Sequence, residues 1–317
     1  MVCYYQKATH DVSSYFVSGR NLPWWLLGTS MVATTFAVDT PLAVSGLVIS
    51  QGIAGNWYWW TGVFSGMLGM FLYSHLWRRP EIITDTQLVE LRYSCKKAAF
   101  LRGFRAVYFS IVYNCIVMGW VNLAMAKILS ETLSLPKLQA TGLCFITTVI
   151  YTASAGLWGV VVTDFFQFAI AMFGAIIMAV IVVTKIGGMN VILSKLSEIY
   201  GVQRATDMTK LIPINSALLP FSFFLIYIGL QWWSTGNTDG GGYFAQRMLA
   251  AKNELHAKIG FLWGNIAHYI LRSWPWVVCG LAAAVVYYKL DPESGKLVYA
   301  IGTKAGQVAD PEVGLFV

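Results

Sequence analysis

The sequence predicts an all-α integral membrane protein, and three observations support that fold class. Charged residues make up 12% of the 317 residues, about half of the roughly 25% that is usual in soluble domains. Apolar residues make up 57%, and the mean hydropathy is +0.60. Apolar runs of about the 20 residues needed to cross a bilayer follow one another along the chain. A soluble protein of this length needs a charged surface that this composition does not supply.

The apolar runs are expected to form seven membrane-spanning helices, of which the fourth is short. In chain order the expected spans are Pro23–Ile49, Trp57–Trp77, Ala106–Leu129, Leu138–Ala153, Leu157–Val183, Ile214–Thr235 and Ile259–Tyr288. The alternative is that these helices are the core of a large soluble protein, but seven such runs are too many for that.

The distribution of Lys and Arg predicts the orientation in the membrane. The loop Arg78–Arg105 holds seven basic residues and is expected to be cytoplasmic. The preceding loop, Gln51–Asn56, has no charge and is expected outside. Alternation then places Lys185–Lys210 outside, despite its four basic residues. We therefore expect a multi-pass protein of the plasma (inner) membrane with a cytoplasmic N-terminus, and we assign the net charge of +7 to its loops rather than to nucleic-acid binding.

The first span carries an aspartate and a proline near its centre, Asp39 and Pro41. A carboxylate at this depth costs several kcal/mol unless it is paired, hydrated or bound to a cation. Proline frees a backbone carbonyl, and a broken helix that offers carbonyls is a natural cation site. The alternative is an ordinary proline kink with Asp39 protonated or reaching the interface. The sequence favours the functional interpretation, because ionisable groups inside a membrane usually have a function.

Polar residues also interrupt later spans. The sixth span mixes Gly229, Gln231 and Trp232 where aliphatic residues are expected, which indicates a second break or, alternatively, a helix end with an interfacial Trp belt. Asp164 follows Ser154–Gly156 and fits either the mouth of a cation path or a helix N-terminal acid favoured by the dipole. In the seventh span, Asn265, His268 and Arg272 share one helix face, which favours a polar seam between helices.

Two linkers, Thr84–Lys97 and Tyr243–Ala257, have amphipathic patterns that suit either interfacial helices or soluble connecting helices. No motif of an enzyme was found: the sequence has no P-loop, no G-x-S-x-G and no H-E-x-x-H. The five cysteines are scattered without a C-x-x-C pair, so they indicate neither a disulfide framework nor a metal site.

The chain contains the stretches SYFVSGRNLPWW (14–25), SAGLWGVVVTDFFQ (154–167), KIGG (185–188) and QRMLAAK (246–252). Together these stretches resemble the sodium:solute symporter family. Ser14–Trp25 (SYFVSGRNLPWW) resembles the entry to the family's first core helix, and Ser154–Gln167 (SAGLWGVVVTDFFQ) resembles its "GGL-x-AV-x-x-TD-x-x-Q" stretch. Lys185–Gly188 (KIGG) resembles the close of that helix. Gln246–Lys252 (QRMLAAK) resembles the "QR-x-LAAK" motif after the sixth core helix. The matches occur in the family's order and cover most of the chain.

The resemblance implies a leucine-transporter-type fold with two inverted repeats of five helices, truncated here to about seven transmembrane helices. It divides the chain into a cytoplasmic segment (1–22), a transporter domain (23–288) and an extracytoplasmic loop (289–317) leading to helices that this partial chain is expected to lack. It implies sodium binding by the Ala33 and Phe36 carbonyls, with Asp39 near the ion and Asp164 near its exit. The residues implied to face the substrate cavity are Thr35, Thr40, Trp59, Gln231 and Trp232.

Departures from the family pattern bear on the solute. The sugar carriers have a glutamate in the second helix where this chain has Trp59 or Trp60, and an asparagine in the sixth where it has about Gly229. The insertion Thr238–Gly242 also departs from them. The expected function is sodium-coupled symport of a small organic solute by alternating access, and the departures favour a solute that is not a sugar or one that is recognised differently. The alternative is a transporter-like membrane sensor that is fused to a signalling module in the full-length protein.

Overall fold

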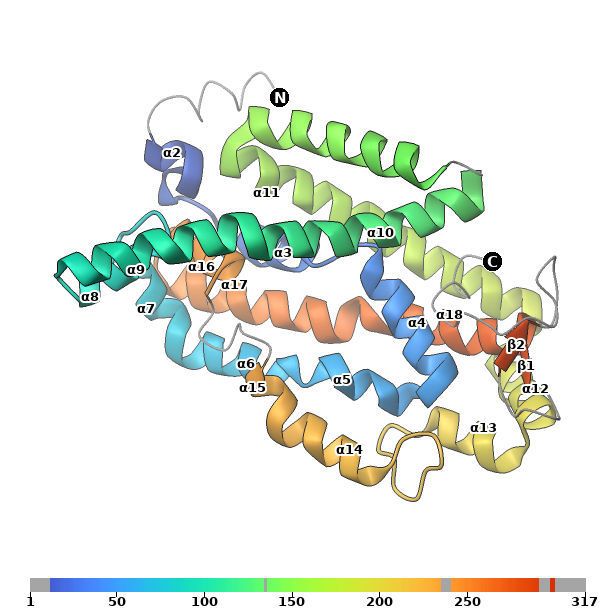
Figure 1. Ribbon diagram of the computed structural model, residues 1–317. Helices are drawn as coiled ribbons and strands as arrows, with labels where there is room; N and C mark the ends of the chain where they lie inside the picture. The colour runs from blue at the N-terminus through green and yellow to red at the C-terminus, as the bar shows by residue number, and fades with distance from the viewer. Residues whose placement is uncertain (1–11, 134–135, 235–240, 291–296, 300–317) are drawn as a thin grey trace. The chain divides into compact units, whose positions relative to one another are not determined.

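The computed structural model describes residues 12–133, 136–234, 241–290 and 297–299, which are helical apart from loops and one short hairpin (Figure 1). They form two compact units, each with its own apolar core, and each is described by itself. Unit 1 takes the described parts of Met1–Ala37, Val63–Phe168 and Thr235–Ala267. Unit 2 takes the described parts of Val38–Gly62, Ala169–Ser234 and His268–Val317. The first span therefore contributes one half to each unit.

Unit 1 contains most of the N-terminal half of the chain. Its elements are α2 (Val12–Val17), the 3-10 helix η1 (Ser18–Arg20), α3 (Trp24–Thr34), most of α6 (Gly62–Leu68), the π-helical turn η3 (Gly69–Tyr73), α7 (Ser74–Arg78), α8 (Gln87–Arg92), α9 (Lys96–Val107), the π-helical turn η4 (Tyr108–Tyr113), α10 (Asn114–Leu133), the first part of α11 (Lys137–Ile186), α16 (Tyr243–Leu249) and α17 (Glu254–Ile266).

The core of unit 1 is built on the close packing of α3 against α17. A Cβ atom on Gly28 of α3 would lie only 2.2 Å from the carbonyl oxygen of Gly260 on α17, so the two backbones touch where neither helix has a side chain. Leu27, Met31 and Phe261 fill the core beside this contact. The apolar face of α3 therefore packs inside unit 1.

Unit 2 contains the second halves of the first and fifth spans and most of the C-terminal part. Its elements are α4 (Asp39–Gln51), the 3-10 helix η2 (Ile53–Asn56), α5 (Trp57–Trp60), the last part of α11, α12 (Met189–Tyr200), α13 (Val202–Thr209), α14 (Phe221–Ile226), the π-helical turn η5 (Tyr227–Gln231), α15 (Trp232–Ser234), most of the π-helical turn η6 (Ala267–Leu271), α18 (Ser273–Val286), β1 (Tyr288–Leu290) and β2 (Leu297–Tyr299).

The core of unit 2 joins α4, α12 and α18. Gly280 of α18 lies against the α4 backbone at Ser45 and the side chain of Val48. The hydroxyl of Tyr200, at the end of α12, donates to the Ala284 carbonyl of α18 at 2.8 Å. After α18 the chain forms an antiparallel hairpin in which Tyr288 is opposite Tyr299. This hairpin lies in the expected extracytoplasmic loop (289–317), most of which is outside the described residues.

Three long helices in the described residues are apolar enough to span a membrane: Lys96–Ser130, Gly156–Ile186 and Glu254–Val286. They correspond to the third, fifth and seventh expected spans. The pair α3 and α4 qualifies as a fourth, broken span that matches the first one. The expected fourth and fifth spans belong to one assigned helix, α11, in which Gly156 has a left-handed backbone (φ 57°) and the chain reverses direction (Figure 1).

The other expected spans differ in detail. The second is divided into α5, α6, η3 and α7 over the expected range. The fourth and sixth are shorter apolar helices, Leu138–Ile150 and Phe221–Gln231. The sixth begins only at Phe221, after Pro220, because proline is favoured just before or at the first turn of a helix. Its expected end at Thr235 lies outside the described residues, as does most of the insertion Thr238–Gly242.

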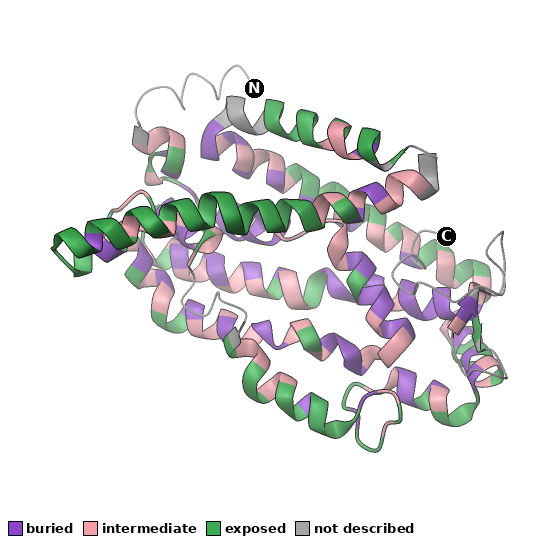
Figure 2. Cartoon of the chain, in the orientation of Figure 1, coloured by how far each residue is buried: buried purple, intermediate pink, exposed green. Residues whose placement is uncertain are grey.

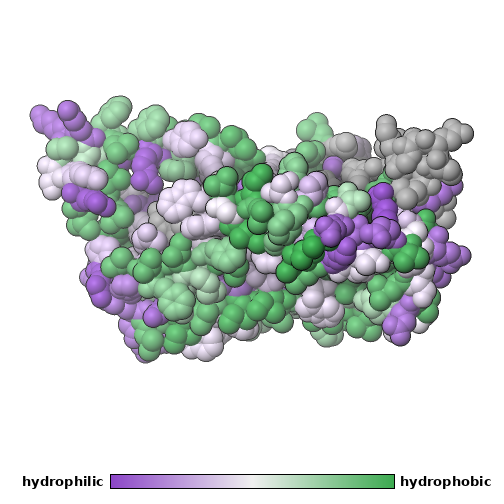
Figure 3. All heavy atoms as spheres, turned by 90° about the horizontal axis from the view of Figure 1, so that it is seen from below, coloured by the Kyte–Doolittle hydropathy of each residue, from purple (hydrophilic) through white to green (hydrophobic). Residues whose placement is uncertain are grey.

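Apolar side chains are exposed over long stretches of helix. Figure 2 shows α9 and the first part of α10 largely exposed, and every residue from 106 to 120 is exposed in the structure. In Figure 3, apolar side chains cover much of the face that is drawn. Lipid is the solvent that suits such a surface.

The amphipathic linkers both form helices, with different burial. Thr84–Lys97 becomes α8 and the start of α9, where Val89 is buried and most other side chains are exposed or half-buried. Tyr243–Ala257 becomes α16 and the start of α17, and α16 buries Ala245, Arg247 and Met248 in the core of unit 1. The second linker is therefore neither a surface helix at the interface nor a solvated connection.

Candidate functional site

The first half of the broken span ends in tight turns. α3 ends at Thr34, and the next amide, that of Thr35, donates to the Val32 carbonyl at 3.2 Å. The Phe36 amide then donates to the Ala33 carbonyl at 2.9 Å. These bonds join residues three apart and tighten the end of the helix. The Ala33 carbonyl, an expected sodium ligand, therefore already accepts one hydrogen bond, and its second lone pair can still accept a cation.

The second half of the span starts with the aspartate. α4 begins at Asp39, and Pro41 lies in its first turn, where a missing N–H leaves no hydrogen bond unmade. The proline thus begins the second helix instead of kinking a continuous one. The carboxylate of Asp39 also lies where a helix dipole favours negative charge.

Asp39 and Thr40 lie together in unit 2. The Asp39 carboxylate interacts with the backbone and hydroxyl of Thr40, and it is attracted electrostatically by Arg272. The Oδ1 atom of Asp39 is buried and has no hydrogen-bond partner among the residues that the structure describes. A buried oxygen of a carboxylate without a partner is costly, so this atom is available for a ligand.

Arg272 is the buried cation that acts electrostatically on Asp39. It is 1% exposed. Its Nε donates to the His268 carbonyl at 3.3 Å, and a second nitrogen lies 2.9 Å from Nδ1 of the His268 ring. The guanidinium also lies 5.5 Å from the centre of the Trp276 ring. The seam expected for His268 and Arg272 therefore exists in unit 2, while Asn265 belongs to unit 1.

Trp59 lies against the same seam. Its ring stacks on Tyr269 with centroids 5.9 Å apart and meets the His268 ring edge-on at 5.8 Å. Its indole N–H donates to Asn56 Oδ1 at 2.9 Å. A Cβ atom on Gly62 would lie 2.3 Å from the Tyr269 hydroxyl, so glycine allows the tyrosine to sit here. Trp59 is connected to the surroundings of Asp39 through His268 and Arg272.

Gln231 and Trp232 lie in the sixth span of unit 2. Gln231 ends the π-helical turn η5, and Trp232 begins α15. Up to Ser234 the predicted interruption is thus a wide turn within a helix, and its continuation to Asn237 lies outside the described residues. The turn is held to α5 by an edge-on contact of Tyr227 with Tyr58 at 5.8 Å. Trp232 meets Trp233 edge-on at 5.5 Å.

Asp164 occupies a polar cluster in the interior of unit 1. Its Oδ2 accepts a hydrogen bond of 2.6 Å from the Ser30 hydroxyl and lies 3.7 Å from a guanidinium nitrogen of Arg247. The side chains of the ion pair are 12% and 6% exposed. A buried charge is tolerated only when it is paired and hydrogen-bonded. Asp164 is therefore bound by the protein itself in this conformation.

Arg247 is held from several sides. Its Nε donates to the Ser30 hydroxyl at 3.3 Å, and a terminal nitrogen donates to the Thr34 hydroxyl at 2.8 Å. Another terminal nitrogen donates to Gln246 Oε1 at 3.2 Å. Since Ser30 and Thr34 lie one turn apart on α3, the arginine links α16 to the last turn of α3, just before the break.

Sequence reasoning did not identify Ser30, Thr34 or Arg247 as partners of Asp164. A signal was present, because a buried acid in an apolar helix requires a cation and the QR motif supplies one. The sequence alone does not say which basic residue folds back onto Asp164. Of the expected sodium ligands, Ala33, Phe36 and Asp164 belong to unit 1 and Asp39 belongs to unit 2.

Comparison with known proteins identifies the family. Residues 15–298 match the sodium:solute symporter family. The chain belongs to this family. The sodium/glucose cotransporter of Vibrio parahaemolyticus is 25% identical over 284 residues, which are 89% of this chain and 50% of that protein. Sodium/myo-inositol cotransporter 2 of Homo sapiens is 25% identical over 324 residues, which are 96% of this chain and 46% of that protein.

A solved structure gives the fold of this symporter-family chain. The substrate-bound, outward-open state of a Na+-coupled sialic acid symporter aligns with a TM-score of 0.73 at 17% identity, covering 90% of this chain and 58% of that one. The predicted leucine-transporter-type fold and multi-pass membrane class are confirmed. The family is one of transporters and not of enzymes, and sodium is its coupling ion. The chain spans about half the length of the curated relatives it matches.

Proposed function

We propose that this chain is part of a symporter that uses sodium to move a small organic solute across the plasma membrane by alternating access. One observation carries the proposal: in a member of the sodium:solute symporter family, the first apolar span is broken directly before a half-buried aspartate. Backbone carbonyls and a carboxylate are oxygen ligands that suit a hard cation, and broken helices provide them in transporters.

In this proposal sodium binds at the break. The Ala33 and Phe36 carbonyls, at the end of α3, and Asp39, at the start of α4, supply its oxygens. The buried Oδ1 of Asp39 supports this role, because it has no hydrogen-bond partner among the described residues. A cation would satisfy that atom and reduce the cost of its burial.

The solute is proposed to contact the side chains around the two altered spans: Thr35, Thr40, Trp59, Gln231 and Trp232. Their chemistry offers hydroxyls, one amide and aromatic faces. That set supports a small organic solute with both polar and apolar parts. The relatives are named for glucose and myo-inositol, but at about 25% identity their solutes are not assigned to this chain. We propose a solute that is not a sugar or one that is recognised differently.

Asp164 is proposed to act at the cytoplasmic end of the ion path. Its ion pair with Arg247, which is bonded to Ser30 and Thr34, supports a role as a closed exit. An incoming sodium ion would compete with the guanidinium for the carboxylate, because both are cations and the carboxylate has a limited number of acceptor positions. Release of Arg247 would then free the end of α3.

We also propose the topology that the charges support. Residues 1–22 are cytoplasmic, 23–288 form the transporter domain and 289–317 are extracytoplasmic. The dense basic loop Arg78–Arg105 supports a cytoplasmic position for that loop. Cysteine labelling from each side of the membrane tests this topology. Cys95 is exposed and lies in that loop, so a membrane-impermeant thiol reagent should label it only after the membrane is opened.

The decisive experiment is uptake of radiolabelled solutes by the full-length transporter, with sodium present or replaced by choline. The screen should cover sugars, amino acids, carboxylates and nucleosides. We expect Asp39→Asn to weaken sodium-dependent uptake at least tenfold, and Glu198→Gln, which removes an exposed acid of α12, to leave it unchanged. Unchanged sodium dependence in Asp39→Asn would exclude the role of this residue. No sodium dependence for any solute in the unaltered protein would overturn the proposed function.

A further inference from the structure

The longest exposed helix of unit 1 is too long for the bilayer core. α9, η4 and α10 form one helix over Lys96–Ser130, 35 residues long, which is about 52 Å at 1.5 Å per residue. The hydrocarbon core of a bilayer is about 30 Å thick and takes about 20 residues of helix. More than a third of this helix therefore extends beyond the hydrocarbon.

The sequence indicates which part extends. No charged residue occurs from Ala106 to Ala126, a stretch of about the length that crosses the core, and Arg105 and Lys127 flank it. The hydrocarbon therefore covers this stretch. The ten residues Lys96–Arg105 lie at the level of the lipid headgroups.

The outward face of this end combines cations with aromatic rings. Ala98 is buried and marks the inward face of α9. Lys96, Lys97, Phe100 and Phe104 are all exposed, with Phe100 at 77% and Phe104 at 59%. At 100° per residue, Phe100 and Phe104 lie one and two turns beyond Lys96 and Lys97 on the same side of the helix. The rings therefore lie between the lysines and the hydrocarbon, on the side of the helix that carries the ammonium groups.

The charge of this region is strongly unbalanced. Over residues 87–107 there is one acid, Glu90, against five basic residues: Arg92, Lys96, Lys97, Arg102 and Arg105. Glu90 is already paired with Arg102. Arg92 lies over the Tyr93 ring, and Arg105 lies over the Phe109 ring. Within the part of the chain that the structure describes, Lys96 and Lys97 are in no ion pair.

We propose that Lys96 and Lys97 bind the phosphate of an anionic phospholipid whose acyl chain lies along Phe100 and Phe104. Charge complementarity selects an anion, and the two exposed rings beside the lysines select one that carries a hydrocarbon chain. An acidic peptide or a nucleic acid would leave both rings in contact with water. A zwitterionic lipid brings its own cation and gains less from the two lysines.

The test compares bound lipids by native mass spectrometry of the purified protein. The protein is incubated with equal amounts of a phosphatidylglycerol and a phosphatidylcholine that have the same acyl chains, and the ratio of bound species is measured. We expect the unaltered protein to prefer phosphatidylglycerol. Lys96→Gln with Lys97→Gln should reduce that preference by up to about 25-fold, because each basic residue near anionic lipid contributes about fivefold. Lys96→Arg with Lys97→Arg should keep the preference.

A matched control removes the same charge elsewhere. Lys185 and Lys195 are also exposed, and they belong to unit 2. Lys185→Gln with Lys195→Gln should leave the preference for phosphatidylglycerol intact. An equal loss in this control would mean that net charge alone attracts the lipid. An intact preference in Lys96→Gln with Lys97→Gln would exclude these two lysines as the phosphate site. Displacement of phosphatidylglycerol by soluble glycerol 1-phosphate or by an oligonucleotide would also overturn the proposal.

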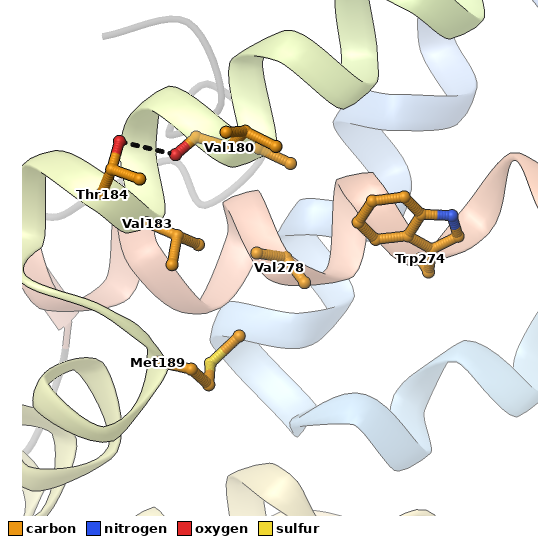
Figure 4. A pocket seen from close by; sticks show the side chains of 7 residues that line it. Val180, Val183, Thr184, Met189, Trp274 and Val278 are labelled. Atoms are coloured by element: carbon orange, nitrogen blue, oxygen red, sulfur yellow. Dashed lines mark hydrogen bonds between the residues drawn. The ribbon is translucent and has the colours of Figure 1, made fainter.

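The apolar groove at the end of α11 provides a second control, because it can take a hydrocarbon chain but has no lysine to bind a phosphate. It has a volume of about 270 Å³ and is lined by Ala179, Val180, Val183, Thr184, Met189, Trp274 and Val278 (Figure 4). The Thr184 hydroxyl is turned back to the Val180 carbonyl at 2.8 Å, so the groove offers apolar surface. Val180→Trp should fill this groove without changing the headgroup preference, which depends on the lysines of α9.

Discussion

Two aspartates inside the membrane-spanning helices differ in how the protein satisfies them. Asp164, in unit 1, accepts a hydrogen bond of 2.6 Å from Ser30 and pairs with Arg247 at 3.7 Å. Asp39, in unit 2, has a buried Oδ1 atom without a hydrogen-bond partner among the described residues, and the attraction of Arg272 acts on it from outside salt-bridge contact. The protein therefore supplies a cation and a hydrogen bond to the Asp164 carboxylate, but it leaves one oxygen of the Asp39 carboxylate without a hydrogen bond among the described residues.

The difference separates a charge that the protein pairs in this conformation from one that is available to a ligand. Removing the partner of a satisfied buried ion leaves an uncompensated charge and costs stability. Asp39→Asn keeps an oxygen that can still accept from Thr40, but it removes a charged ligand for a cation. If this comparison is right, changes around Asp164 should act mainly on folding, and changes at Asp39 should act mainly on sodium.

The largest expected effect follows removal of the cation in unit 1. Arg247→Met keeps a long side chain but leaves Asp164 buried and unpaired, so it should reduce stability by about 3–5 kcal/mol. The thermal midpoint of the purified protein in detergent measures this loss. Adding Asp164→Asn should recover most of it, because the stranded charge is then gone. A double variant no more stable than Arg247→Met would mean that lost packing, and not charge, sets the cost.

The second effect concerns sodium and the aspartate of unit 2. Sodium at 100 times its Kd should stabilise the unaltered protein by about 2.7 kcal/mol, since a ligand that binds only the folded state shifts the equilibrium. Asp39→Asn should lose most of this stabilisation while keeping the midpoint measured in choline. The titration of thermal midpoint against sodium checks both points. A lower midpoint in choline would show that the charge of Asp39 stabilises the fold through its contacts with Thr40, and would break the comparison.

The third effect compares the surroundings of the two aspartates. A Cβ on Gly28, in unit 1, would meet the Gly260 carbonyl at 2.2 Å, whereas a Cβ on Gly62, in unit 2, would meet the Tyr269 hydroxyl at 2.3 Å. Backbone cannot move aside as the end of a side chain can. Gly28→Ala should therefore cost about 1–3 kcal/mol, and Gly62→Ala should cost less. Equal losses in thermal midpoint would mean that unit 2 is packed as rigidly as unit 1.

The fold could be predicted largely from the sequence, because the apolar runs indicate the individual spans and the family motifs indicate how those spans are arranged. Twenty-residue apolar runs indicate spans whatever their neighbours are, and the third, fifth and seventh spans appear as long helices. The second and sixth were less predictable. Turns at Thr61 and at Tyr227–Gln231 change the helix without changing its hydropathy.

The candidate site was predictable only in part. The break near Asp39 could be anticipated, since a charge and a proline together are rare in a span. The partner of Asp164 could not, because Arg247 lies 83 positions away and only the folded unit brings α16 to α3. The amphipathic pattern of Tyr243–Ala257 suggested an exposed helix, but the cost of burying Arg247 is offset by Asp164, Ser30 and Thr34. The pairing of charges that are far apart in the chain could therefore not be predicted from the sequence.

The smallest effect is a pH dependence at a third aspartate, outside the spans. Asp207 in α13 is buried, which opposes its charge, but Lys210 and the Ala217 amide donate to it at 2.7 and 3.0 Å. The net effect holds the pKa of its carboxyl below the ordinary value of 3.8. A lowered pKa means that the charged form stabilises the fold above about pH 4, and that this stabilisation is lost as the pH falls through the lowered value.

Asp207→Asn should therefore flatten the fall in thermal midpoint between pH 5 and pH 3, while costing about 1 kcal/mol or less at neutral pH. Lys210→Met should flatten it only partly, because the Ala217 amide still donates to the carboxylate. Equal slopes in the unaltered protein and in Asp207→Asn would contradict the assignment. The outcome bears on the two membrane aspartates, since Asp207 belongs to the same unit as Asp39. If unit 2 satisfies Asp207 fully, the unpaired oxygen of Asp39 is a local feature of the helix break and not a general looseness of unit 2.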